Sequence, residues 1–234
     1  MIRVTQRIFV LLILVAGVTP ASAAVQIFID QAQEGDPTDR SAFMLAIASL
    51  GITPSFEGFN DEFATTPGPL VYDDFEIVGV GLSNGFRSET DPRFVSEGTR
   101  AIEYTAVSDG TSVTFGFTEP INVFGIDIND WGTNSLGILR ISNDTGTFFE
   151  EWLVDQPPYW ERGERLFFGA IDDQPFSSVT VFANTDLDRI GLDYLTYGQL
   201  GVDQIPEPSS LLIWSLIGTA GLGYVARRRR QHRV

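Results

Sequence analysis

The sequence predicts a mainly β protein: a single antiparallel β-sandwich or jelly roll with one short N-terminal helix. Three observations predict this fold class. Stretches of alternating apolar and polar residues recur along the chain, as in Val113–Phe117 and Ser178–Ala183. Gly, Asn, Asp and Pro separate these stretches at short intervals, as in sandwiches and barrels. Helical spacing of apolar residues is clear before the strands begin, between residues 38 and 50.

The N-terminal part is expected to contain a short strand, Val25–Asp30, and then a helix around Thr38–Leu50. Asp36 and Pro37 resemble a helix start, because Asp is a good N-cap and Pro suits the first helical position. Gly51 ends the pattern. The predicted apolar face consists of Phe43, Ala46, Ile47 and Leu50. We interpret this face as packing against the core at one edge of a sandwich that extends from about Phe56 to Leu200.

Eight or more short strands are expected in the middle of the chain. Asp109-Gly110 has the composition of a hairpin turn, and Pro120 is expected at a strand start or sheet edge. The clearest strand stretches are Val113–Phe117, Phe124–Ile128, Leu136–Ile141, Thr147–Val154, Leu166–Ile171 and Ser178–Ala183.

Residues 1–23 have the composition of a secretory signal peptide. Arg3 and Arg7 precede the apolar run Ile8–Val18, and Ala21-Ser22-Ala23 supplies small residues for signal peptidase. The alternative is an N-terminal anchor, but this run is shorter than the ~20 residues that span a bilayer. Cleavage is therefore expected after Ala23.

The C-terminal residues indicate a transmembrane helix. Leu211–Ala226 carries no charge, and the arginine cluster follows at once: Arg227, Arg228, Arg229 and Arg230. Basic residues beside a span tend to stay in the cytoplasm. The arginine cluster is therefore expected on the cytoplasmic side of the inner membrane, with residues 24–204 on its outer side.

The tripeptide Pro206, Glu207 and Pro208 precedes this apolar stretch. A Pro-Glu-Pro motif, an apolar helix and a terminal arginine cluster together resemble the PEP-CTERM sorting signal of Gram-negative bacteria. The resemblance implies that residues 205–234 are the sorting signal and that exosortase recognises Pro206–Pro208 and removes the tail. It implies a precursor anchored in the inner membrane and a product at the cell surface or outside the cell. The alternative is a permanent C-terminal anchor.

The resemblance continues into residues 24–204. Phe56-Glu57-Gly58-Phe59, Thr118–Ile128, Leu166–Ala183 and Asp188–Gly198 are similar to segments of exported PEP-CTERM proteins. For that family, the resemblance implies a jelly-roll sandwich like those of carbohydrate-binding modules. These motifs are structural, and the family brings no agreed biochemical activity.

The expected exported part is strongly acidic. All 31 acidic residues lie between Asp30 and Glu207, where only eight arginines occur, so its formal charge is 8 − 31 = −23. Such a surface repels nucleic acid and attracts divalent cations. The chain has no Cys or Lys, and its single histidine is His232. These absences exclude Ser-His-Asp and Cys-His nucleophiles, lysine Schiff bases and nearly all zinc sites.

Oxygen-bearing side chains suggest a calcium site at Asp127, Asn129 and Asp130, which we expect at the end of a strand. The alternative is ordinary turn chemistry and solvated charge.

Aromatic residues suggest a carbohydrate-binding surface formed by Trp131, Tyr159 and Trp160, the last two in a Pro-rich loop. The alternative is burial in the core. A third group, Glu150, Glu151, Glu161 and Glu164, contains enough carboxylates for a glycosidase pair.

Three functions follow from these features. The first is a non-enzymatic surface or matrix protein associated with exopolysaccharide or biofilm, which meets signal peptidase and exosortase during export. The second is a carbohydrate-binding module, and the third is a carboxylate-based hydrolase.

Overall fold

The computed structural model describes residues 25–33, 37–107, 110–131, 137–154, 164–184 and 188–200. They form one helix, α1 (Ser41–Ser49), and an antiparallel sheet system. Its strands are β1 (Val25–Gln33), β2 (Ser55–Glu57), β3 (Leu70–Val71), β4 (Phe75–Val80), β5 (Leu82–Glu89), β6 (Ala101–Ala106), β7 (Thr111–Trp131), β8 (Gly137–Asn143), β9 (Phe149–Val154), β10 (Glu164–Asn184) and β11 (Asp188–Gly198). The signal-peptide and sorting-signal predictions lie outside the described residues.

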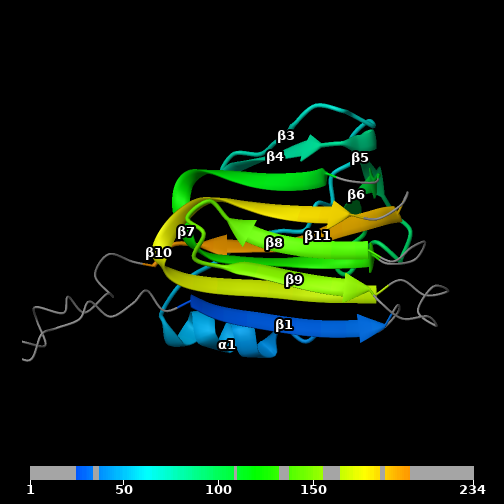
Figure 1. Cartoon of the computed structure of the whole chain (residues 1–234). Coiled ribbons are helices and arrows are strands. Elements are labelled where there is room, and N and C mark those ends of the chain that lie inside the picture. The colour runs from blue at the N-terminus through cyan, green and yellow to red at the C-terminus, as the bar shows by residue number, and fades with distance from the viewer. Residues whose placement is uncertain are drawn as a thin grey trace, which may run out of the picture.

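The strands fold into the predicted β-sandwich because β7 and β10 each pass through both layers (Figure 1). In the first layer, the first half of β7 and the second half of β10 pair with each other, flanked by β4 and β8. Strands β3 and β9 complete this layer. In the second layer, the other halves of β7 and β10 pair, flanked by β11 and β1. Strands β6 and β2 pair with β11, and β5 pairs with β6.

Two prolines lie where these long strands change layers. Pro120 is inside β7, and Pro175 is inside β10, where the pairing register shifts between Ile171 and Phe176. A proline has no N–H for a sheet ladder, so it is tolerated where regular pairing is interrupted. The prediction that Pro120 starts a strand or lies at an edge was therefore wrong. Val113–Phe117 and Phe124–Ile128, predicted as separate strands, are the two halves of β7, and Leu166–Ile171 and Ser178–Ala183 are the two halves of β10.

The hairpin predicted at Asp109-Gly110 was also wrong. Strand β6, before this turn, pairs with β5 and β11 in the second layer. The first half of β7, after it, pairs with β4 and β10 in the first layer. The connection between β6 and β7 therefore joins the two layers. A two-residue turn sequence does not indicate which neighbour each strand pairs with.

The main core fills the space between the layers. Alternate residues Val113, Phe115 and Phe117 enter it from the first half of β7, and Ile126 and Ile128 from the second half. Each of these side chains is at most 8% exposed. The period-two alternation in the sequence therefore identified the inward-facing side chains correctly.

Helix α1 begins later than predicted. It starts at Ser41, and Pro37 lies in a non-helical segment. The carboxylate of Asp39 accepts a hydrogen bond from the Ser41 N–H at 2.8 Å. Arg40, at the N-cap position, makes no side-chain cap, because a guanidinium has no acceptor for a backbone N–H; it is ion-paired with Asp127. Gly51, with φ of 65°, follows the helix as predicted.

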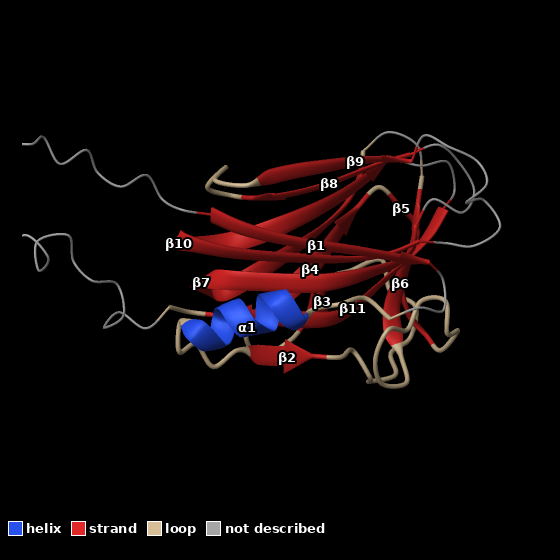
Figure 2. Cartoon of the chain, turned by 90° about the horizontal axis from the view of Figure 1, so that it is seen from below, coloured by secondary structure: helices blue, strands red, loops and turns tan. Residues whose placement is uncertain are grey.

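The apolar face of α1 packs on the outer surface of the second layer, not at the predicted edge (Figure 2). Phe43 and Ile47 are buried there with Val123 of β7 and Phe167 of β10. Phe43 lies over a pair of glycines, Gly125 and Gly169, that face each other across β7 and β10. A Cβ atom on either glycine would lie 2.7 Å from the Phe43 ring. The glycine pair thus lets the helix approach the sheet closely.

Candidate binding site

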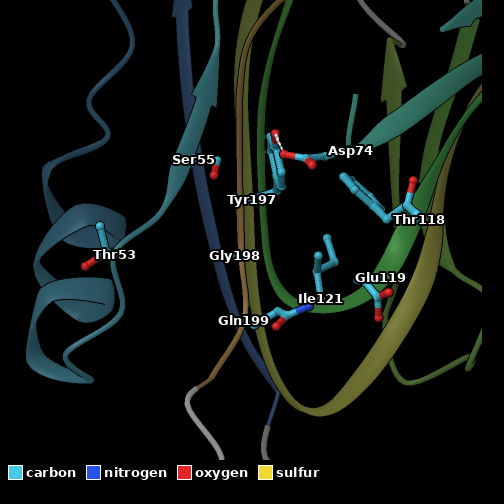
Figure 3. A pocket seen from close by; sticks show the side chains of 10 residues that line it. Thr53, Ser55, Asp74, Thr118, Glu119, Ile121, Tyr197, Gly198 and Gln199 are labelled. Carbon is cyan, nitrogen blue, oxygen red and sulfur yellow. Dashed lines mark hydrogen bonds between the residues drawn. The ribbon is translucent and has the colours of Figure 1, made fainter. Parts of the chain in front are cut away.

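A pocket of about 380 Å³ opens where β7 bends between the layers (Figure 3). We call it the bend pocket. Its lining comes from the bend of β7, the end of β11, the turn before β4, and the segment around β2. The lining residues are Thr53, Ser55, Asp74, Phe117, Thr118, Glu119, Ile121, Tyr197, Gly198 and Gln199. Its volume is within the range of small-ligand sites.

One wall of the bend pocket belongs to an ordered aromatic cluster. The Tyr197 ring centroid lies 5.5 Å from that of Phe75 and 5.5 Å from that of Phe117. The Tyr72 ring stacks on that of Phe75, with 4.5 Å between the ring centroids and an interplanar angle of 13°. Because neighbouring rings fix its position, Tyr197 offers a preformed flat surface at low entropic cost.

The polar groups of the pocket are also held in place. The Tyr197 hydroxyl donates a hydrogen bond to the Asp74 carboxylate at 3.0 Å, and the Thr118 N–H donates to the Asp74 carbonyl at 2.9 Å. Burial, followed by the hydrogen bond to Asp74, raises the pKa of Tyr197. Its hydroxyl therefore stays protonated at neutral pH and can donate a hydrogen bond. Glu119 and Gln199 are exposed at the rim.

This arrangement suits binding of a polyhydroxylated ligand. The half-buried Tyr197 presents apolar ring surface, with the buried Phe117 behind it, and Asp74, Glu119 and Gln199 supply acceptors for hydroxyl hydrogens. Thr53, Ser55 and Thr118 add hydroxyl groups that donate and accept. The lining contains none of the usual nucleophile–base pairs, since it has no His, Cys or Lys.

The predicted calcium ligands lie elsewhere, on the outer surface of the second layer. Asp127 and Asn129 are fully buried within β7, not at its end as predicted. The Thr90–Arg100 segment, which we call the strap, runs over them. The Asn129 amide donates to the Phe94 carbonyl of the strap at 2.8 Å. Arg165 donates to the strap carbonyls of Pro92 and Val95 at 2.7 and 3.2 Å.

A buried carboxylate pair lies beneath the strap. Asp127 of β7 is the cross-strand neighbour of Asp193 of β11. The Asp127 carboxylate is ion-paired with Arg40 and accepts a hydrogen bond from the Thr38 hydroxyl at 3.1 Å. Burial raises the pKa of the Asp127 carboxyl, and the Arg40 guanidinium opposes that rise. Arg40 also lies 3.7 Å above the Tyr194 ring, which completes its packing.

Asp193 anchors the strap. Its carboxylate accepts hydrogen bonds from the N–H groups of Ser96, Glu97 and Tyr194 at 2.7, 2.8 and 2.8 Å. Burial raises the pKa of Asp193 to about 6, and these hydrogen bonds oppose the rise. The two aspartates therefore serve packing of the strap and α1 against the sheet.

In the described part of the chain, no three acidic or histidine side chains gather in a metal-binding group. Arg40 supplies the positive charge beside Asp127, and Asn129 is turned toward Phe94. Asp130, 5% exposed with φ of 59°, follows them near the end of β7. Calcium binding at Asp127, Asn129 and Asp130 stays a prediction.

The other predicted site residues fall largely outside the described residues. Tyr159 and Trp160 do so, as do Glu161 and the side chains of Trp131 and Glu164. Of the remaining carboxylates, Glu151 on β9 is ion-paired with Arg140 of β8. Pro206, Glu207, Pro208 and the arginine cluster Arg227–Arg230 are also outside. The described residues contain no helix of the length and apolarity that a membrane span requires.

The bend pocket was missed in the sequence. Asp74, Glu119 and Tyr197 come from three distant segments, and each resembles the many other acidic or aromatic residues of the chain. The one local signal was Thr118–Ile128, where Glu119 and Pro120 interrupt an otherwise apolar alternation. A bend was not inferred from it.

No protein-family model matches the chain, and no curated protein matches it. Solved structures with a similar fold include a mutant family 29 carbohydrate-binding module complexed with mannohexaose, at 13% identity and a TM-score of 0.40. That match covers 67% of this chain and 99% of the other. A cleaved adhesin domain of Lys-gingipain matches at 12% identity and a TM-score of 0.40, over 62% and 99% of the two chains. These similarities are too low to assign a ligand.

Proposed function

We propose that this chain is an exported, non-catalytic protein of the cell surface or extracellular matrix that binds polysaccharide through the bend pocket. The observation that carries the binding proposal is the pocket itself: a fixed tyrosine face beside carboxylate, amide and hydroxyl groups. Aromatic rings accept the apolar faces of sugar rings, and the polar groups accept their hydroxyl hydrogens. The sequence between residues 24 and 204 contains no His, Cys or Lys, which favours binding over covalent catalysis.

Replacing Tyr197 with Ala is expected to weaken oligosaccharide binding at least tenfold, about 1.4 kcal/mol, since the stacking surface is lost. The full chain, in a detergent without sugar head groups, is titrated calorimetrically with a panel of neutral hexasaccharides. Phe182→Ala is the matched control, because Phe182 is a half-buried aromatic on the outer surface of the first layer. Equal affinity for the two variants, or release of reducing ends from any hexasaccharide, would contradict this function.

The export part of the proposal is supported by the sequence of residues 205–234. The Pro206–Pro208 motif precedes an apolar stretch and then the arginine cluster Arg227–Arg230. Residues that precede a proline favour extended conformations, and Glu207 offers a single charge for recognition. Exosortase is the proposed processing partner, and the inner membrane holds the precursor.

In cells with an exosortase, Glu207→Ala is expected to stop removal of the tail and keep the protein in the membrane fraction. Asp203→Ala is the control, because it removes the same charge four residues earlier and should leave processing unchanged. Processing is followed by the mass of the protein in membrane and extracellular fractions. Normal processing of the Glu207 variant would refute the sorting assignment.

A further inference from the structure

The bend pocket is an acidic site whose charge is not neutralised by a lining arginine. Asp74 and Glu119 line it, and its described lining includes no basic residue. Glu57 also contributes negative charge near the pocket. Burial and Asp74 raise the pKa of Tyr197 most, and the charge of Glu57 raises it further. A ligand in this pocket therefore meets two carboxylates and an aromatic wall.

The described arginines are bound in ion pairs and hydrogen bonds elsewhere. Arg87 and Arg189 pair with the buried Glu103 in the second layer. Arg40 pairs with Asp127, and Arg165 donates hydrogen bonds to strap carbonyls.

In the first layer, Arg140 of β8 pairs with Glu151 of β9. The remaining two, Arg93 and Arg100, pair with Asp91 and Glu62. Because these partners hold the guanidinium groups outside the pocket lining, the pocket keeps its negative field.

The negative potential of the pocket favours a positively charged ligand over a negatively charged one. A uronic acid or a sulfated sugar would bring a like charge against Asp74 and Glu119, which is unfavourable. A protonated amine would gain charge-assisted hydrogen bonds to a carboxylate. It would also gain a cation–π contact if it lay over the face of Tyr197. A neutral sugar would make only the hydroxyl contacts.

We infer that the bend pocket recognises a sugar unit carrying a free, protonated amine, with Asp74 and Glu119 as the amine-binding carboxylates. This inference rests on the proposed function and names the ligand class of the same site. It goes beyond that function because a general polysaccharide site would not distinguish an amino sugar from its acetylated form. The Tyr197 hydroxyl positions Asp74 through their 3.0 Å hydrogen bond.

The test compares two probes of equal length, a tetramer of glucosamine and a tetramer of N-acetylglucosamine. Each is titrated calorimetrically into the full chain at about pH 6 and about 0.15 M salt, where distant surface charges are screened. The free-amine tetramer is expected to bind at least tenfold more tightly. Asp74→Asn and Glu119→Gln are each expected to reduce that preference to less than about threefold, because they retain hydrogen-bonding groups but remove the charge.

The control for overall charge is Glu150→Gln, which removes one negative charge from β9 in the first layer and should keep the preference intact. If Glu150→Gln reduces the preference as much as the pocket variants do, the attraction is general and the inference is wrong. Equal binding of both tetramers, abolished by Tyr197→Ala, would overturn amine recognition and leave polysaccharide binding standing. If neither tetramer nor any neutral hexasaccharide binds, the proposed function fails as well.

Discussion

Replacing Arg40 with Leu is expected to lower the free energy of unfolding by about 3–5 kcal/mol, because it leaves the buried Asp127 carboxylate without its cation. The Asp127 side chain has 0% exposure and that of Arg40 only 17%, so the carboxylate is poorly hydrated without the guanidinium. The hydroxyls of Thr38 and Ser96 would remain as hydrogen-bond donors, but two neutral hydroxyls offset little of the cost of a buried charge. The measurement is urea-induced unfolding of the full chain, followed by tryptophan fluorescence.

Two further variants separate the buried pair from ordinary surface charge effects. Arg140→Leu removes an arginine whose partner Glu151 is 35% exposed, and should cost no more than about 1 kcal/mol. Adding Asp127→Asn to Arg40→Leu should recover much of the loss, because no unpaired charge then remains. An equal loss for Arg40→Leu and Arg140→Leu would show that Asp127 is not a buried charge that depends on Arg40.

The loss in Arg40→Leu should also depend on pH. Without the guanidinium, burial raises the pKa of Asp127 further above its unfolded value. A raised carboxyl pKa means that the folded state binds a proton more readily than the unfolded state, so the deficit shrinks as the pH falls. The deficit is therefore expected to be largest near neutral pH and smallest near pH 4.

Local patterns were sufficient for the fold class. The alternation in Val113–Phe117 and Ser178–Ala183 depends only on the two-residue period of a strand, so it identified inward-facing side chains before any pairing was known. Phe43 and Ile47 were likewise recognised as the buried face of a helix from their spacing. The charge of the chain also excluded whole classes of function without any structure.

Features that depend on distant segments could not be predicted. The ion pair of Asp127 was not predicted, because its partner Arg40 lies 87 residues earlier in the chain. The bend pocket combines Thr53 with Gln199, and only the folded strands bring them together.

The strand patterns also did not indicate that α1 and the strap cover the outer surface of the second layer. The segments that cover Gly125, Asp127 and Gly191 are distant from these strand residues in the sequence. In the structure, α1 covers Gly125, and the strap residue Phe94 packs over Gly191, where a Cβ atom would lie 2.8 Å from it. Both α1 and the strap require a glycine beneath them. This requirement becomes clear only when the side chain that packs over each glycine is known.

The contact between Phe43 and the glycine pair is expected to be the other large contributor to stability. Phe43→Ala should lower the free energy of unfolding by about 3–5 kcal/mol, because it removes a ring that is 1% exposed and leaves a cavity under α1. Gly125→Ala should cost about 1–3 kcal/mol, because its new methyl group would lie 2.7 Å from the Phe43 ring. Both are measured by urea unfolding of the full chain.

A control in the same strand distinguishes this clash from a general effect of adding a methyl group to β7. In Gly116→Ala the nearest atom to the new Cβ is Glu76 Cγ at 3.6 Å, an ordinary contact, so stability should change by less than about 0.5 kcal/mol. Combining Gly125→Ala with Phe43→Ala should cost less than the sum of the two single losses, since the Phe43 ring is gone and only the Phe167 ring, 3.3 Å from the new Cβ atom, remains close. If the two losses add in full, Phe43 and Gly125 are not in contact, and α1 does not depend on the glycine pair for its close approach.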